Sequence, residues 1–170
     1  LLGRLHHPGI AQVHEAGLAT PEGGGLPQPF FAMELVEGLP ITEHADRQAL
    51  GTRERLELFA RLCDAVEHAH SKNVVHRDLK PGNIMVASTG KATTASVSGD
   101  ARPMRVLLGD FGLARDASAG GGLTLSGNLL GTPAYMSPEQ ASGRTKEVDA
   151  QSDVFGLGSG GERGVADLGD

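Results

Sequence analysis

The chain has 170 residues, of which 39% are hydrophobic and 21% are charged, so it is long enough for one domain with a buried core. Its formal net charge of -6 argues against a nucleic-acid partner, because nucleic-acid-binding proteins gather Lys and Arg. The single cysteine, Cys63, excludes a disulfide within the chain and favours a reducing, cytoplasmic location. No apolar run approaches the roughly 20 residues that span a bilayer, so no membrane segment is expected in this chain.

The first part of the chain predicts short elements separated by turns. The leucines within 1–5 predict the end of a helix, and the proline and glycine in the break at 7–9 end it. A short strand is expected over 10–13. The segment 20–29 is rich in Gly and Pro, which predicts a loop, and the apolar run 30–36 has the length of a strand.

The clearest predicted element is a helix over 53–72. Apolar residues recur there at steps of three and four, and they widen into two adjoining stripes, so much of the helix should be buried. The first stripe consists of Leu56, Phe59, Cys63 and Val66. Thr52 is the expected N-cap, and Asn73 is the expected C-terminal stop.

Two features of this helix favour structural roles. Cys63 lies on an apolar stripe, which favours a place in the core over that of a reactive thiol. His68 and His70 are two residues apart on a helix and face different ways, so surface or packing roles are favoured over a metal site.

Further along the chain, the apolar runs 84–86 and 105–108 predict strands. The insert between them, 87–103, is rich in Ser, Thr, Ala and Gly and is expected to be disordered. The tail 159–170 predicts a poor helix, because each helical Gly is about 1 kcal/mol less favourable than Ala. This abrupt change of composition suggests a reading-frame shift or a truncated gene model as a hypothesis.

Three motifs follow one another in order. The segment His-Arg-Asp-Leu-Lys-Pro-Gly-Asn at 76–83 fills every fixed position of the pattern H-R-D-L-x-x-x-N, and Asp-Phe-Gly follows at 110–112. Gly-Thr-Pro-Ala-Tyr-Met-Ser-Pro-Glu then occupies 131–139. With these motifs the chain resembles the catalytic domain of eukaryotic-type serine/threonine protein kinases. The His-Ala-His before the first motif and the Pro-Glu-Gln-Ala after the last resemble the bacterial members.

The resemblance implies an α+β fold of the protein-kinase type, present in part. It covers 1–158 as a partial kinase domain, in which 1–36 would be the end of the N-lobe and the hinge. The segment 37–158 would be the first half of the mainly helical C-lobe, and 159–170 would be an atypical tail. The family's Gly-rich loop, strand lysine and αC glutamate have no counterpart in these 170 residues, so the chain is expected to be an incomplete fragment.

The resemblance also implies catalytic roles. Phosphoryl transfer requires positioning and charge neutralisation more than covalent chemistry. Asp78 would orient the substrate hydroxyl and accept its proton, and Lys80 would offset charge beside the γ-phosphate of ATP. Thr132 would hydrogen-bond to both of them. Asn83 and Asp110 would be the oxygen ligands of Mg²⁺.

The nucleotide pocket is implied in the same way. The segment Met-Glu-Leu-Val at 33–36 matches the hinge, where the carbonyl of Glu34 and the N–H of Val36 would bind adenine. Met85 would form the apolar floor under the ring. Asp153 matches the helix aspartate that holds the backbone of the catalytic loop.

The expected function is transfer of the ATP γ-phosphate to Ser or Thr hydroxyls of a protein substrate. Lys80 and the Gly-Thr-Pro of 131–133 resemble the serine/threonine branch and not the tyrosine branch. A catalytically inactive remnant or binding module stays open as an alternative. A small-molecule phosphotransferase of the antibiotic type is disfavoured, because such enzymes lack the Gly-Thr-Pro-x-Tyr and Pro-Glu segment.

Overall fold

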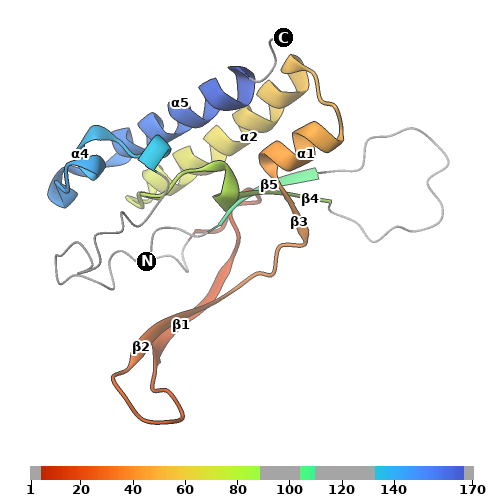
Figure 1. Ribbon diagram of the computed structural model, residues 1–170. Helices are drawn as coiled ribbons and strands as arrows, with labels where there is room; N and C mark the ends of the chain where they lie inside the picture. The colour runs from red at the N-terminus through yellow and green to blue at the C-terminus, as the bar shows by residue number, and fades with distance from the viewer. Residues whose placement is uncertain (1–4, 89–103, 110–132, 167–170) are drawn as a thin grey trace, which may run out of the picture.

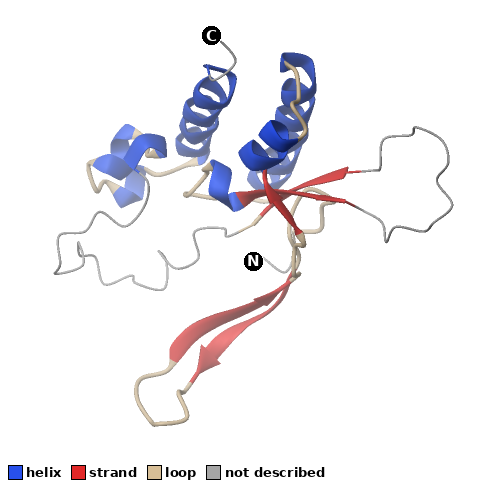
Figure 2. Ribbon diagram, turned by 45° about the vertical axis from the view of Figure 1, so that its right-hand side comes forward, coloured by secondary structure: helices blue, strands red, loops and turns tan. Residues whose placement is uncertain are grey.

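The computed structural model describes residues 5–88, 104–109 and 133–166. The described chain forms two parts, a body of helices around a small sheet and a β-hairpin that projects from it (Figures 1 and 2). In the hairpin, β1 (Val13–Ala19) pairs antiparallel with β2 (Gln28–Met33). The body contains an antiparallel sheet in the order β3-β4-β5. Its strands are β3 (Gly38–Pro40), β4 (Ile84–Ser88) and β5 (Met104–Leu108).

The helices of the body lie against this sheet and against one another (Figure 2). They are α1 (Ile41–Arg47), α2 (Thr52–Ser71), α4 (Pro138–Ala141) and α5 (Ala150–Ala166). Short 3₁₀ turns are η2 (Pro81–Asn83), η3 (Pro133–Tyr135) and η4 (Thr145–Glu147). Helices and sheet together make an α+β body. Among the described helices, none is both long and apolar enough to cross a membrane.

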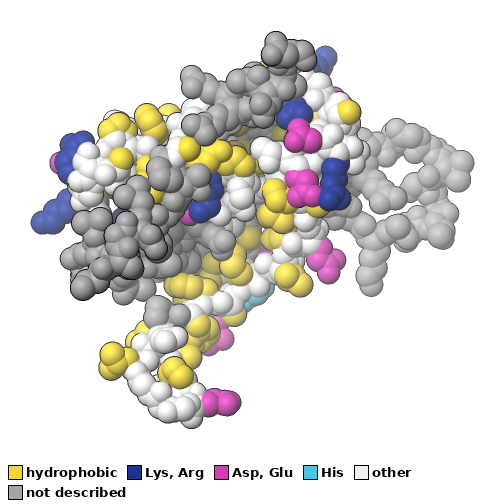
Figure 3. Space-filling view, viewed as in Figure 1, with side chains coloured by type: hydrophobic (Ala, Val, Ile, Leu, Met, Phe, Trp, Pro, Cys, Tyr) yellow, Lys and Arg dark blue, Asp and Glu magenta, His cyan; other side chains and the backbone are white. Residues whose placement is uncertain are grey.

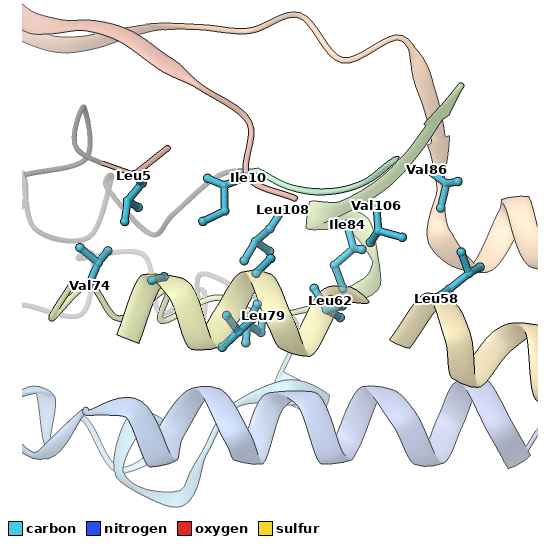
Figure 4. Packing of buried hydrophobic residues seen from close by; sticks show 13 residues of the cluster. Leu5, Ile10, Leu58, Leu62, Val74, Leu79, Ile84, Val86, Val106 and Leu108 are labelled. Atoms are coloured by element: carbon cyan, nitrogen blue, oxygen red, sulfur yellow. The ribbon is translucent and has the colours of Figure 1, made fainter. Parts of the chain in front are cut away.

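The core lies between α2 and the sheet of the body (Figure 4). Leucines of α2 meet the inward side chains of β4 and β5, and Leu79 enters the same cluster from the segment before η2. Full burial of each such side chain is worth roughly 1.5–3 kcal/mol. The buried members include Leu5, Ile10, Leu58, Leu62, Val66, Leu79, Ile84, Val106 and Leu108.

The helix predicted over 53–72 is confirmed as α2, with a difference at its first turn. Gly51 is the N-cap in place of Thr52, and its N–H donates to Oε2 of Glu54 at 2.9 Å. The Glu54 carboxylate thus accepts a hydrogen bond from the backbone of Gly51, which has no side chain to act as a cap. Asn73 follows the helix with a φ of 57°, the left-handed conformation of a C-terminal stop, as expected.

One N-terminal prediction is displaced along the chain. The helix end expected within 1–5 lies almost wholly outside the described residues. Ile10 makes only an isolated bridge to Leu108, so the strand expected over 10–13 is wrong. The strand β1 instead begins at Val13, where the partner strand becomes available. Its partner β2 ends at Met33, three residues before the predicted end.

The insert predicted to be disordered begins within a strand, because Ala87 and Ser88 complete β4. The rest of the insert, 89–103, lies outside the described residues, as do the motif at 110–112 and the first part of the motif at 131–139. The strand expected over 105–108 is confirmed as β5, which starts one residue earlier.

The tail contradicts its predicted structure, because α5 continues through the glycines to Ala166. Glycine weakens a helix without forbidding it, and each added residue only has to extend a helix that is already nucleated. The first turns of α5 are fixed by the buried residues Ser152 and Asp153. The glycine-containing turns of α5 therefore extend a helix whose first turns are already fixed by packing.

Candidate active site

The catalytic-loop segment 76–83 connects the end of α2 to β4 and is held by Asp153 of α5. The Asp153 carboxylate is almost fully buried, at 1% exposure. Its Oδ2 accepts the backbone N–H of His76 at 2.7 Å, and its Oδ1 accepts that of Arg77 at 2.8 Å. Nε2 of His70 lies 2.8 Å from Oδ2, a packing role of the kind expected for this histidine. This geometry fits the anchoring role that the resemblance implies for Asp153.

The same anchor explains an unusual backbone conformation. Arg77 has a φ of 69°, in the left-handed region that is costly for a residue with a side chain. The conformation turns two successive N–H groups toward one carboxylate. Gly156, one turn further along α5, allows this helix to approach the catalytic loop closely. A Cβ there would lie 3.3 Å from both the Cβ and the carbonyl oxygen of Leu79.

The imidazole of His76 links the loop to the end of β5. Its Nδ1 accepts the N–H of Asp78 at 3.3 Å, so Nε2 carries the proton and donates to the carbonyl of Gly109 at 2.8 Å. The N–H of Gly109 donates in turn to the carbonyl of Asn83 at 3.0 Å. The residue that precedes Asp110 in the sequence is therefore fixed beside the catalytic loop.

Three of the predicted site residues meet in one cluster. Nζ of Lys80 donates to Oδ2 of Asp78 at 2.8 Å, and Nδ2 of Asn83 donates to the same oxygen at 3.1 Å. The side chains of Asp78 and Lys80 are each 26% exposed, so the ion pair is reachable from solvent. The loop thus presents a carboxylate, an ammonium and an amide side by side.

Asn83 is oriented by two hydrogen bonds from its amide nitrogen. Besides the bond to Oδ2, Nδ2 donates to the backbone carbonyl of Asp78 at 2.8 Å. Both bonds use the nitrogen, and no described residue bonds to the amide oxygen. Amide and carboxylate oxygens are the ligands that Mg²⁺ prefers. The amide oxygen of Asn83 is thus of the ligand type that its expected role requires, while the other expected ligand, Asp110, lies outside the described residues.

The predicted hinge lies where β2 ends and the chain returns to the body. The N–H of Glu34 donates to the carbonyl of Gln12 at 2.8 Å, and Oε2 of Glu34 accepts the N–H of Gln12 at 3.2 Å. Nη1 of Arg105 donates to Oε1 of Glu34 at 3.0 Å. Val36 and Met85 are half-buried, as residues in contact with a bound ring would be.

Two predicted site residues cannot be placed, because Asp110 and Thr132 lie outside the described residues.

Cys63 is half-buried, and burial raises the pKa of its thiol, which supports the expected structural role.

Gln140 is a contributor that the sequence analysis did not single out. Its Nε2 donates to the carbonyl of Arg77 at 2.6 Å, and its Oε1 accepts the N–H of the fully buried Ser137 at 3.0 Å. It thereby ties the end of the third motif to the catalytic loop. The spacing Ser-x-x-Gln at 137–140 is a capping-box signature, and this signal could have identified Gln140.

With this geometry established, comparisons identify related proteins. The family model described as protein kinase domain matches residues 1–160. The chain is 37% identical over 158 residues to serine/threonine-protein kinase PknB of Mycolicibacterium smegmatis, covering 91% of this chain and 22% of the relative. It is 41% identical over 160 residues to the DNA damage-responsive serine/threonine-protein kinase RqkA of Deinococcus radiodurans, covering 93% and 21%. The chain thus spans about a fifth of the length of these relatives.

A solved structure shows the same arrangement. The crystal structure of the Mycobacterium tuberculosis PknI kinase domain superposes with a TM-score of 0.57 at 28% sequence identity. The match covers 92% of this chain and 49% of the PknI chain. The described fold is therefore similar to about half of a solved kinase domain.

Proposed function

This chain belongs to the protein kinase family, and from that premise we propose that it forms part of a catalytic unit that transfers the γ-phosphate of ATP to Ser or Thr hydroxyls of a protein substrate. Family membership confirms the kinase-type fold expected from the motifs at 76–83 and 131–139. The names of the relatives, serine/threonine-protein kinases from bacteria, support Ser and Thr as acceptors.

The observation that carries the proposal is the cluster of Asp78, Lys80 and Asn83. An acceptor hydroxyl must be oriented toward the phosphorus and must lose its proton as the new P–O bond forms. Lys80 and Asn83 both donate to Oδ2 of Asp78, which leaves Oδ1 as the oxygen without a donor among the described residues. In this mechanism Asp78 holds the hydroxyl and takes its proton, while Lys80 offsets negative charge near the transferred group.

The remaining site residues are proposed in the roles that family membership implies. Asn83, through its amide oxygen, and Asp110 would hold Mg²⁺, which when bound neutralises the charge of the phosphates. Thr132 would hydrogen-bond to Asp78 and Lys80. The adenine would lie against the hinge, between the backbone of Glu34 and Val36 on one side and the side chain of Met85 on the other.

The proposal includes a cellular site. ATP is held in the cytoplasm, so this part of the protein is expected to act there. Its partners would be ATP and a protein that presents a Ser or Thr hydroxyl.

The experiment measures transfer of labelled phosphate from Mg-ATP to a generic acceptor protein. The chain is tested alone and joined to the N-terminal lobe of a complete kinase domain, which in protein kinases carries the Gly-rich loop that covers the phosphates. Asp78→Asn preserves the size of the side chain and removes the proton acceptor, so transfer by the joined protein should fall at least a hundredfold. Glu57→Gln, on the exposed face of α2, is the matched control and should leave transfer unchanged.

Equal transfer by the Asp78→Asn variant and the unaltered joined protein would mean that Asp78 is not the base. Absence of transfer from both, with nucleotide binding retained, would favour the alternative of an inactive kinase remnant or binding module.

A further inference from the structure

A half-enclosed apolar cavity lies beside the catalytic loop, whose residues Leu79 and Lys80 line it. It has a volume of about 150 Å³ and is bounded by α1, α2, the turn η2 and α5. Figures 1 and 2 show α2 and α5 running side by side above the sheet of the body, with α1 next to α2. The cavity shares one residue, Lys80, with the cluster proposed to perform phosphoryl transfer.

The walls are apolar almost throughout. The apolar lining includes Leu58, Phe59 and Leu62 of α2, together with Ile84 of β4 and Leu157 of α5. Buried polar groups with no partner would favour water in such a space, whereas an apolar wall leaves it dry.

The polar residues at the wall direct their charged groups elsewhere. Nη2 of Arg55 donates to Oδ1 of Asp46 at 2.8 Å, and its Nε donates to the carbonyl of Leu50 at 3.0 Å. Nζ of Lys80 donates to Asp78. Both side chains therefore present mainly their hydrocarbon stems to the cavity.

The cavity is open because small residues lie on two of its walls. Ala45 lies on α1, and Gly160 lies on α5 where larger side chains could have filled the space. A Cβ added at Gly160 would meet no atom within 4 Å. The lining atoms consequently lack contact partners on one side, and an apolar occupant would restore those dispersion contacts.

From these observations we propose that the cavity is a binding site for a small uncharged hydrocarbon group, of the size of a benzene ring or a short alkyl chain. An enclosed apolar cavity of about 150 Å³ lined by Leu, Ile and Phe binds benzene or xenon, and this half-enclosed cavity has a similar volume and lining. Its open side provides an entry path. Leu79, Lys80 and Pro81 also line the cavity, so an occupant contacts the catalytic loop.

Benzene is the probe. The chain is labelled with ¹³C in the methyl groups of Leu and Ile, and benzene is titrated while methyl spectra are recorded. Saturable shifts are expected for Leu62, Leu79 and Ile84, which line the cavity. Leu18, which is 71% exposed on the hairpin, should not shift.

A matched pair of variants separates filling of the cavity from helix stabilisation. Gly160→Leu places a side chain into the cavity, whereas Gly158→Leu adds the same side chain to the same helix at an exposed position outside the lining. Both remove a helical glycine, so both gain the same helix propensity. Benzene should bind at least tenfold more weakly to Gly160→Leu and within twofold of the unaltered chain to Gly158→Leu.

A second variant that fills the cavity is included in case Gly160→Leu disrupts α5 locally. Ala45→Val extends the opposite wall and should also weaken benzene binding several-fold. The proposal is overturned if benzene at its solubility limit shifts none of the lining methyl groups. It is also overturned if Gly160→Leu and Gly158→Leu bind benzene equally. Neither result depends on phosphoryl transfer, so it leaves the proposed function untouched.

Discussion

The body and the β1–β2 hairpin differ in what holds each of them in place. In the body, the loop at 76–77 is fixed by Asp153, a residue more than seventy positions further along the chain. In the hairpin, β1 is paired with β2, and nearly all side chains over 14–28 are exposed. Figure 3 shows hydrophobic side chains on the surface of the hairpin at the bottom of the view.

Because of this difference, the hairpin and the body are expected to differ in their free energy of opening. A two-stranded hairpin alone is only marginally stable in water, so it can open without unfolding the rest. The loop cluster cannot be lost in that way, because its anchors come from α2 and α5. The proposed site for phosphoryl transfer is therefore expected to be as stable as the body, and the strand next to the predicted hinge to be less stable.

The largest expected effect is that of Asp153→Ala. The substitution leaves three donors without their acceptor, the N–H groups of His76 and Arg77 and Nε2 of His70. Leaving buried polar groups unsatisfied is costly, so we expect the free energy of unfolding to fall by about 3–5 kcal/mol. Urea unfolding followed by circular dichroism measures this value.

The control for this substitution is Glu57→Ala on α2. Glu57 forms an exposed ion pair with Arg53 at 3.3 Å, and such pairs contribute less than about 1 kcal/mol. If both variants lose similar stability, then Asp153 does not anchor the loop.

The next effect is that of Leu108→Ala at the centre of the body. Leu108 is fully buried on β5 and belongs to the core cluster. Removal of buried methyl groups costs the transfer free energy and leaves a void, which together amount to about 3 kcal/mol. The same urea measurement applies, and Leu56→Ala is the control because Leu56 is 51% exposed on α2. A loss below 1 kcal/mol for Leu108→Ala would contradict the proposed position of the core.

Elements with a strong hydrophobic period could be predicted from the sequence, and short elements could not. The twenty residues of α2 carry two apolar stripes, so their helix was predicted to within one residue. The seven residues of α1, Ile41–Arg47, contain too few apolar positions to establish a period. The position of β1 depends on where β2 pairs with it, which is a property of two segments and not of one.

In the candidate site, too, contacts within one motif could be predicted and contacts between distant segments could not. The resemblance that the motif at 76–83 carries implied a shared site for Asp78, Lys80 and Asn83, and the structure brings these three side chains together. The contact of Gln140 with the carbonyl of Arg77 joins segments 63 residues apart. No local pattern specifies such a partner, although the capping box at 137–140 marks Gln140 as a residue with a structural role.

A smaller effect is expected at the junction of the two regions, where Arg105 of β5 contacts Glu34 in the segment predicted as the hinge. Arg105→Ala removes the ion pair with Glu34 and the hydrogen bond from Nε to the carbonyl of Pro8 at 2.9 Å. The two charged side chains are about one-third exposed, at 33% and 29%. We therefore expect a loss of only about 1 kcal/mol in the free energy of unfolding.

Hydrogen exchange at single backbone amides measures the effect of Arg105→Ala locally. The amide of Glu34, which donates to Gln12, should exchange faster in Arg105→Ala, while the amide of Arg77 should exchange as before. Arg105→Lys retains the charge and should show about half of the effect. Unchanged exchange at Glu34 would mean that the hinge does not depend on Arg105.

The smallest expected effect is that of Leu18→Thr on β1. Leu18 is 71% exposed, so its replacement changes little buried area, and Thr is well suited to a strand. The free energy of unfolding of the body should stay within about 0.5 kcal/mol of its original value. The matched variant is Gly17→Val, whose Cβ would lie 2.9 Å from the outer ring atoms of Phe30, a part-exposed side chain that can shift. Because Val favours a strand and Gly weakens one, Gly17→Val should slow hydrogen exchange over β1 and β2 while the urea midpoint of the body stays constant. A shift of that midpoint by Gly17→Val as large as the shift caused by Leu108→Ala would show that hairpin and body unfold as one unit, and the distinction between them would then be lost.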